Sequence, residues 1–375
     1  MSGVHLLGVG ATSFSRRRRD PRPLAREAVG AALADAGLTP RAVDGIAIAG
    51  AEAGFEAGCF DVLDAPPGRF LCRCGLGASA LHAAWKAVSS GASDVVVCIG
   101  HDPAFCNPVG DKRQGGSGAG GPAGGAPSLQ SLAVAARLYM RASGATEEHL
   151  ARVVAKNRAH GAANPHALLR ESVGVEEVLA SDLLDWPLRR LMVATPAQGA
   201  TAVVLGGREV GRRSGPRPPR LRTSILVDDG PAGGGDSSLG EVPPAESAAS
   251  AARLGYFAAD LGPEDVDLAE IEDPTPVEEL TAYEALELAP AGCGPELVES
   301  GFTALGGVVP VNPSGGALAQ GRVSGNGAIR QLFELSLQLR DRAGSRQVPG
   351  ARVALALGGG WLARGNLASL TILST

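Results

Sequence analysis

Helical and strand-like hydrophobic patterns alternate along this chain, and one combination of them occurs twice. Residues 24–50 begin as an alanine-rich amphipathic helix, pass through a proline turn and end in the apolar run GIAIAG. Residues 248–273 follow the same order, and the spacing Leu-x-Pro-x-x-Val-Asp at 38–44 recurs at 261–267. Small residues on one side of a helix allow close packing on a sheet, so we expect each segment to supply a helix and a strand of a layered α/β structure.

A second pair of units follows the first pair in each part of the chain. Residues 77–100 predict a helix and then the buried strand DVVVCIG, and residues 325–358 predict a helix and then the strand ARVALALG. Chance similarity between alanine-rich helices is the alternative explanation, but two matched units in matched order favour an internal duplication. Repeated alternation of helix and strand is typical of buried sheets covered by helices.

An insertion separates the two halves. Two helices are predicted in it, at 131–144 and 146–165, before the pattern returns to a strand near 200–205. The expected organisation is an N-terminal half at 1–108 plus about 192–210, an inserted loop domain at 109–191 and a C-terminal half at 218–375.

The composition is that of a globular protein with a sizeable core, since 45% of the residues are hydrophobic and 19% are charged. A net charge of −5 gives no indication of nucleic acid as a partner. The run Arg16–Arg19 is interpreted as a solvated turn, with a phosphate site as the alternative. No apolar run approaches the ~18 residues that cross a bilayer, so we expect no membrane span.

Cysteine usage indicates a reducing compartment. The six cysteines show no CxxC spacing, so we expect neither a metal site nor a disulfide framework. A cytoplasmic location is the resulting prediction.

Cys74 is the candidate nucleophile. The sequence CGLG at 74–77 places it on a glycine-containing turn before a predicted helix, whose N-terminal amides would favour a thiolate. The alternative is a small buried residue, as free cysteines commonly are. We expect Cys72 to point to the opposite face of the strand from Cys74, and Cys98 to lie in the core.

Six segments in this order resemble those of one family and together span nearly the whole chain. They are CGLGASALHAAWKAVSSG (74–91), HLARVVAKNRAHGAANPHA (149–167), VEEVLASDLLDWPLRRL (175–191), EIEDPTPVEELTAYEALEL (270–288), VNPSGGALAQGRVSGNGAIRQ (311–331) and ALGGGWLARG (356–365). The chain resembles the thiolase superfamily and, within it, thiolases of the sterol-carrier-protein or lipid-transfer-protein type.

The resemblance implies a duplicated α/β fold of two five-stranded mixed sheets layered between helices (αβαβα), with an inserted loop domain, in a homodimer. It implies acyl-CoA thioester substrates, no separate cofactor, no metal, and an acyl-Cys74 intermediate. The implied oxyanion hole consists of the backbone amides of Cys74 and Gly358, which side-chain changes leave intact. Asn312, Ser314 and Gly315 would bind substrate. A small protein with an OB-fold and a zinc ribbon is an implied partner.

The chain departs from the family pattern at three of its chemical positions. All six histidines precede residue 167, and Glu272 and Arg322 stand where the family has histidines. Ala356 stands where the family has a basic cysteine. Glu272 is either a base or half of an ion pair with Arg322 that fills a vacated site. His101 either lies near the strand-end crevice in which open α/β sheets bind ligands or is an ordinary hydrogen-bonded loop histidine.

Three functions are compatible with these residues. The first is a divergent acyltransferase that takes an acyl group from a CoA or carrier-protein thioester onto Cys74 and uses Glu272 in place of histidine. The second is an aldol or retro-aldol lyase, although relatives of that kind resemble a version with tyrosine in the Glu272 region, and the nearby tyrosine here is Tyr283. The third is a non-catalytic subunit that binds acyl-CoA or supports an active partner.

Overall fold

The computed structural model describes residues 3–50, 54–63, 70–102, 128–213, 218–228, 245–323, 325–359 and 367–375. Within these residues, nine strands form one mixed sheet and two short strands form a hairpin. The strands are β1 (Val4–Ala11), β2 (Gly45–Ala49), β3 (Phe70–Cys74), β4 (Val95–Asp102), β5 (Leu183–Asp185), β6 (Leu188–Arg189), β7 (Gly199–Gly206), β8 (Arg220–Asp228), β9 (Leu268–Ile271), β10 (Val353–Gly358) and β11 (Leu367–Ser374).

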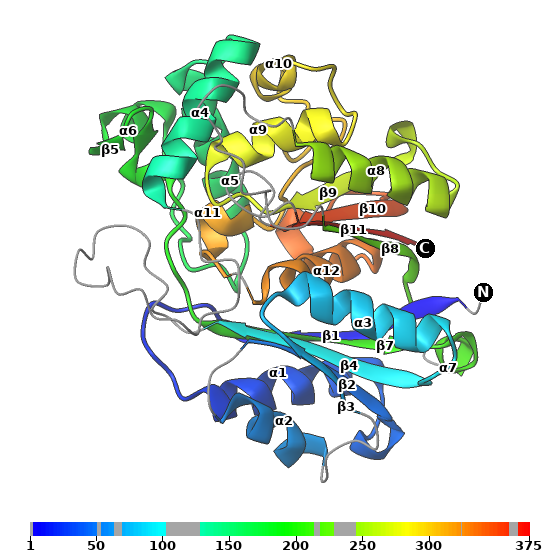
Figure 1. Cartoon of the computed structure of the whole chain (residues 1–375). Coiled ribbons are helices and arrows are strands. Elements are labelled where there is room, and N and C mark those ends of the chain that lie inside the picture. The colour runs from blue at the N-terminus through cyan, green and yellow to red at the C-terminus, as the bar shows by residue number, and fades with distance from the viewer. Residues whose placement is uncertain are drawn as a thin grey trace, which may run out of the picture.

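Helices separate and cover the two parts of the large sheet, which gives five alternating layers (Figure 1). The helices are α1 (Pro21–Ala36), α2 (Phe55–Leu63), α3 (Gly77–Ser89), α4 (Leu129–Ser143), α5 (Glu147–Ala162), α6 (Val175–Ala180), α7 (Arg208–Arg213), α8 (Glu246–Ala259), α9 (Pro276–Ala285), α10 (Gly294–Glu299), α11 (Gly316–Gln320) and α12 (Gly327–Leu339). Helices α1 and α2 lie on one outside, α3 and α12 lie in the middle, and α8 and α9 lie on the other outside.

The predicted duplication is confirmed by the strand order β3-β2-β4-β7-β1-β8-β11-β10-β9. Read outward from its centre, this order matches β1 with β8, β7 with β11, β4 with β10 and β2 with β9. The proline turns that the sequence predicted are short 3₁₀ helices at Pro40–Ala42 and Pro263–Asp265, each directly before β2 or β9. The α/β fold with two similar halves is therefore as expected.

The number of strands differs from the expected two sheets of five. The half-sheets join into one sheet because β1 pairs with β8 at two positions, Val4 with Leu221 and His5 with Arg220. In the second half, the fifth strand is reduced to an isolated bridge between Ala269 and Val311. Pro310 and Pro313 flank Val311 in the sequence. Because proline has no backbone N–H to donate to a neighbouring strand, this segment cannot form a longer strand.

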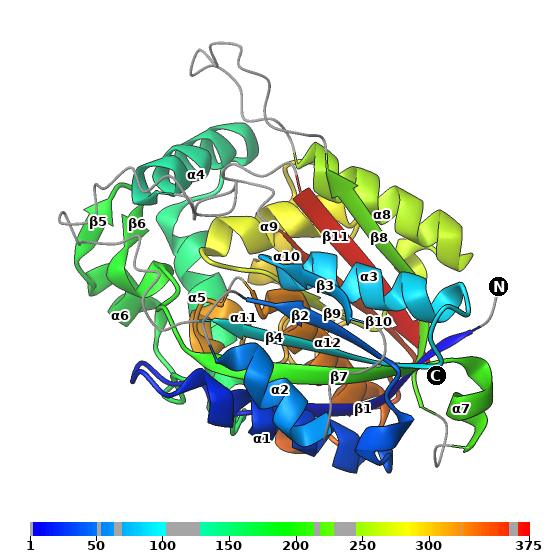
Figure 2. The same ribbon diagram turned by 60° about the horizontal axis from the view of Figure 1, so that its bottom comes forward.

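Three apolar clusters fill the spaces between the layers. One lies between α1 and the N-terminal half-sheet, and another surrounds α3 and α12 in the middle layer. The third joins β10, β11, α8 and α9 to α4 and α5. Helices α4 to α6 and the β5–β6 hairpin gather beside the layers (Figure 2). No helix among the described segments has the length and apolarity required to cross a bilayer.

Candidate functional site

Cys74 is the last residue of β3, which lies at the edge of the sheet and pairs only with β2 among the described strands. Its side chain is partly exposed, and its carbonyl oxygen accepts a hydrogen bond of 3.0 Å from the Gly50 N–H. Two residues separate it from Gly77, the first residue of α3. The predicted turn from strand to helix is therefore present.

The N-terminal ends of α3 and α12 meet beside this turn. A β-carbon on Gly77 would lie 2.8 Å from the carbonyl oxygen of Gly325, and one on Gly100 at the end of β4 would lie 2.7 Å from the same oxygen. Only glycine permits these approaches. Since a helix N-terminus carries a partial positive charge, two such ends converge near Cys74.

Glu272 reaches the same region from the C-terminal half. It follows β9, and its Oε2 accepts a 3.0 Å hydrogen bond from the backbone N–H of Gly359. A β-carbon on Gly327, the first residue of α12, would lie 3.5 Å from this carboxylate oxygen. The carboxylate is thus held between a backbone N–H and a helix N-terminus, both of which favour a negative charge.

Arg322 does not pair with Glu272, so the predicted ion pair is wrong. No hydrogen bond or ion pair joins them in the part of the chain that the structure describes. The backbone of Arg322 instead exchanges hydrogen bonds with Thr195 (2.7 Å) and Ala197 (3.2 Å). Burial raises the pKa of Glu278 to about 7, and hydrogen bonds from Thr275 and the charge of Arg322 oppose this rise. Arg322 therefore acts electrostatically on Glu278.

Gly358 ends β10, at the position expected to supply one amide of the oxyanion hole. It pairs with Ser369 across to β11. The Gln331 side chain of α12 donates a 2.9 Å hydrogen bond to the Leu357 carbonyl, which fixes the strand end against the helix. The next amide, that of Gly359, is the one that Glu272 engages.

The three residues predicted to bind substrate, Asn312, Ser314 and Gly315, serve the protein's own structure. Asn312 and Ser314 are fully buried, and Ser314 donates from both its backbone N–H (3.0 Å) and its hydroxyl (2.7 Å) to Glu270. The Asn312 side chain accepts from the Ile271 N–H at 2.7 Å. Gly315 has φ +94° and packs against the backbone of α5. The Asn312 and Ser314 side chains are thus engaged within the protein, and substrate binding by the three residues stays a prediction.

A buried acidic network holds this loop in place. Glu279 accepts hydrogen bonds from Asn312 (2.7 Å), Asn157 (2.6 Å) and Tyr283, and pairs with Lys156 at 2.6 Å. Asp273 accepts from the first turn of α11, with Ala317 N at 2.5 Å. The network joins the loop-domain helix α5 to the C-terminal half. Tyr283 is fully buried in it, so it does not replace Glu272 at the site.

His101 is completely buried near the end of β4, so the alternative of a loop histidine is wrong, while a role near the strand-end crevice stays a prediction. Its ring stacks on Phe55 with centroids 4.6 Å apart, and Gln198 Nε2 lies 3.4 Å from its Nε2. Burial lowers the pKa of His101 to about 4, which keeps the ring neutral at neutral pH.

The prediction that Cys72 and Cys74 point to opposite faces is wrong. Strand side chains alternate at every residue, so residues two apart share a face. Both cysteines pack against the middle apolar cluster. Cys98 is fully buried in β4, as predicted.

Sequence reasoning missed the Gly359 hydrogen bond to Glu272 and the buried network. A signal for the network was available, because Glu270 interrupts the apolar strand LAEI and four further acidic residues follow within nine positions. Burial and the charge of Glu334 raise the pKa of Glu270 to about 8. A carboxyl at a strand position that faces the core indicates internal hydrogen bonding.

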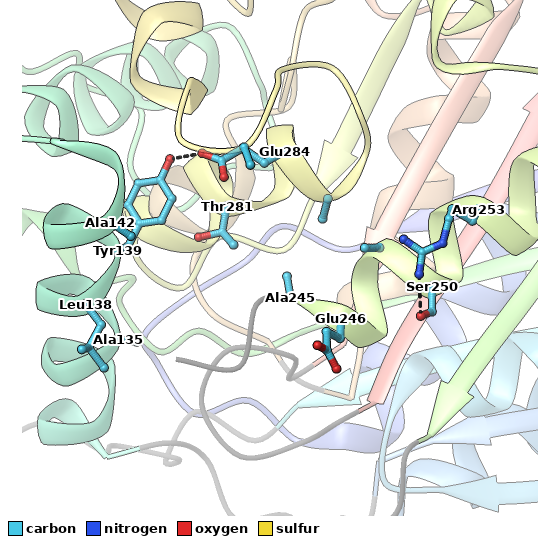
Figure 3. Close-up of a pocket in the computed structure, with 13 residues that line it drawn as sticks. Ala135, Leu138, Tyr139, Ala142, Ala245, Glu246, Ser250, Arg253, Thr281 and Glu284 are labelled. Carbon is cyan, nitrogen blue, oxygen red and sulfur yellow. Dashed lines mark hydrogen bonds between the residues drawn. The ribbon is translucent and has the colours of Figure 1, made fainter. Parts of the chain in front are cut away.

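One cavity of about 600 Å³ lies elsewhere, between α4, α8 and α9. Alanines line much of it, and the Tyr139 hydroxyl donates to Glu284 at one end (Figure 3). None of the predicted site residues lines this cavity.

Comparison with known proteins identifies the family. Residues 238–375 match the family described as Thiolase C-terminal domain-like. The chain is 30% identical to sterol carrier protein 2 of Bos taurus, with 94% of this chain and 69% of that protein covered. It is 30% identical to the benzoylsuccinyl-CoA thiolase subunit BbsB of Thauera aromatica, with 96% of each covered. The solved structure of the Ltp2-ChsH2(DUF35) aldolase is similar over 100% of this chain and 98% of that chain, with 25% identity and a TM-score of 0.83. This chain therefore belongs to the thiolase superfamily, as a member of its sterol-carrier-protein type.

Proposed function

We propose that the protein is a divergent thiolase-like acyltransferase, which takes an acyl group from a CoA or carrier-protein thioester onto Cys74. The observation that carries the proposal is the position of Cys74, partly exposed at the end of β3 where the N-termini of α3 and α12 meet. Positive helix ends favour both a thiolate and the oxyanion that forms when a thioester is attacked.

The first half-reaction needs little from side chains. Cys74 Sγ attacks the thioester carbonyl carbon, the bond from that carbon to the CoA sulfur breaks, and the CoA thiolate leaves and takes up a proton from water. Backbone amides, including that of Gly358, supply the charge stabilisation, for which a single donor contributes roughly 3–4 kcal/mol. Acylation therefore survives the loss of the family's histidines.

The second half-reaction depends on Glu272. This carboxylate removes a proton from the acceptor, and the acceptor attacks the acyl-Cys74 carbonyl carbon. The bond from that carbon to Cys74 Sγ breaks, and the released thiolate takes the proton back from Glu272. A carboxylate is a weaker base than imidazole near neutral pH, so the acceptor must be readily deprotonated or itself nucleophilic.

Retro-aldol cleavage is the second candidate, and one observation favours it. The aldolase named above is similar to this chain over its whole length at a TM-score of 0.83. In that case Glu272 takes the proton from the substrate's β-hydroxyl and the bond between the α- and β-carbons breaks. The electron pair stays on the α-carbon as the thioester enolate, which takes up a proton from water, and Cys74 is left unmodified.

A partner protein and a homodimer are part of the proposal. The relatives support a partner, since one is described as a thiolase subunit and the other as a complex with a DUF35 protein. We expect a small OB-fold and zinc-ribbon chain of that kind. The homodimer draws support from the edge strand β3, whose Phe70 is 44% exposed.

Intact mass after incubation with acetyl-CoA and longer acyl-CoAs tests the acyltransferase. We expect an acyl adduct on the wild type and on Cys293→Ser, a matched control for a partly exposed thiol, and no adduct on Cys74→Ala. If no protein forms an adduct but the Cys74→Ala variant cleaves a β-hydroxyacyl-CoA, the protein is a retro-aldol lyase and not an acyltransferase. Absence of both activities would leave a non-catalytic subunit.

A further inference from the structure

Cys72 and Cys74 occupy successive positions on one face of the edge strand β3. Their parallel partners on β2 are Ala47 and Ala49, in the same order. Both thiols are partly exposed and reach the same apolar cluster. Their α-carbons are two residues apart along an extended strand, about 6.6 Å, which is at the upper end of the range that a disulfide spans.

The Cys74 thiol lies close enough to Cys72 to affect its ionisation. Burial and the neighbouring Cys74 thiol together raise the pKa of Cys72 to about 12. Cys72 is thus protonated at neutral pH and carries the proton that a leaving hydroxyl needs. Cys98 lies two strands away, across Ala47, and is fully buried, so it is too distant to compete.

The position of β3 makes a small adjustment possible. Among the described strands it is bonded to β2 alone, so its backbone can shorten the Cys72–Cys74 separation without breaking a second described ladder. The intervening Arg73 side chain is exposed and pairs with Glu56, on the other face from the thiols.

We propose that Cys72 and Cys74 form a redox pair, in which Cys72 resolves an oxidised Cys74 as a reversible disulfide. A hydroperoxide oxidises the Cys74 thiolate to the sulfenic acid and is itself reduced to an alcohol, or to water in the case of hydrogen peroxide. Cys72 Sγ then attacks Cys74 Sγ, the sulfur–oxygen bond breaks, and the hydroxyl leaves as water with the Cys72 proton. A dithiol reverses the bond by exchange.

The pair would protect the site sulfur from irreversible oxidation. A sulfenic acid without a resolving thiol proceeds to the sulfinic acid, which ordinary thiols do not reduce. This inference does not depend on acyl transfer, since it concerns the two sulfurs alone.

Peroxide treatment of the full chain followed by tryptic mass mapping tests the pair. Trypsin cleaves after Arg69, Arg73 and Lys86, so Cys72 and Cys74 are the only cysteines of the fragment 70–86 and lie on either side of Arg73. In the reduced protein the digest yields two separate peptides, 70–73 and 74–86. In the oxidised wild type we expect a disulfide to join them into one species two hydrogens lighter than their summed masses, and dithiothreitol to release the two peptides again. In Cys72→Ser we expect loss of the disulfide and accumulation of Cys74 sulfenic acid, trapped by dimedone, and then of sulfinic acid.

Cys293→Ser serves as the control and should form the disulfide as the wild type does. Thermal unfolding checks that Cys72→Ser is folded. Sulfinic acid at Cys74 of the wild type without a 72–74 disulfide would overturn the proposal. So would a Cys74 that stays reduced while Cys293 is oxidised.

Discussion

The carboxylate of Glu272 accepts the backbone N–H of Gly359 at 3.0 Å, which links the end of β9 to the residue that follows β10. In this way the acidic residue that replaces a family histidine is fixed next to the strand end that carries Gly358. This hydrogen bond fixes the orientation of the Glu272 carboxylate, which places a negative charge beside the implied oxyanion hole.

Replacing Glu272 with Gln separates the two half-reactions. Gln keeps a hydrogen-bond acceptor for the Gly359 N–H but is not a base. We expect acylation of Cys74 to proceed at a similar rate, or faster, and transfer from acyl-Cys74 to fall by about 10²-fold. Stopped-flow release of CoA and the lifetime of the acyl adduct measure the two steps. An unchanged adduct lifetime would remove Glu272 from the role of base.

Substituting Gly77 with Ala should disturb the meeting of the two central helices. The new β-carbon would lie 2.8 Å from the Gly325 carbonyl oxygen, so the α12 end must move. We expect a loss of about 1–3 kcal/mol in the free energy of unfolding and slower acylation of Cys74.

Gly30→Ala is the matched control for this change. Gly30 lies within α1, where a β-carbon meets nothing within 4 Å. Because alanine is the better helix former, we expect a gain of up to about 1 kcal/mol. Urea denaturation compares the two variants, and equal effects of both would contradict the steric argument at Gly77.

Removing only one partner of the buried ion pair between Lys156 and Glu279 should lower the free energy of unfolding substantially. Their side chains are 8% and 0% exposed, so Lys156→Met leaves an uncompensated carboxylate in the interior. We expect a loss of about 3–5 kcal/mol. Adding Glu279→Gln removes that charge and should recover part of the loss. A double variant no more stable than Lys156→Met would show that the charge is not the cause.

Glu278 should make stability fall as pH rises through neutrality. Burial places its folded-state pKa at about 7, above the ordinary value of 4.5. Its contribution is therefore fully present below pH 4.5 and is lost as the pH passes 7. Glu278→Gln still accepts from Thr275 but does not titrate.

We expect the difference in unfolding free energy between the wild type and Glu278→Gln to change by about 3 kcal/mol between pH 4.5 and pH 8, in favour of Gln. Chemical denaturation at a series of pH values measures this. A constant difference across that range would contradict a raised pKa.

Hydrophobic periodicity was sufficient to predict the layered fold and its duplication. The helix at Pro21–Ala36 and the strand at Gly45–Ala49 follow directly from local pattern, as do their counterparts Glu246–Ala259 and Leu268–Ile271. The pairing of Val4 with Leu221 could not be predicted, since two residue pairs far apart in the sequence leave no periodic signal.

The site was predicted less completely, for two physical reasons. The position of Cys74 follows from local turn chemistry, but the partner of Glu272 is a backbone amide, which has no sequence signature. Asn312 and Ser314 were expected to bind substrate because the family resemblance implies it, and a resemblance does not show that their side chains also form internal hydrogen bonds. Only the fold shows these contacts.

The middle layer is built from α3 of one half and α12 of the other, and the sulfur and the carboxylate each arrive with their own half. Under the proposed function, neither repeat alone would hold both reacting groups. A change that loosened the packing of α3 against α12 would then abolish the proposed activity while each repeat stayed folded, so that activity would depend on how the two repeats dock.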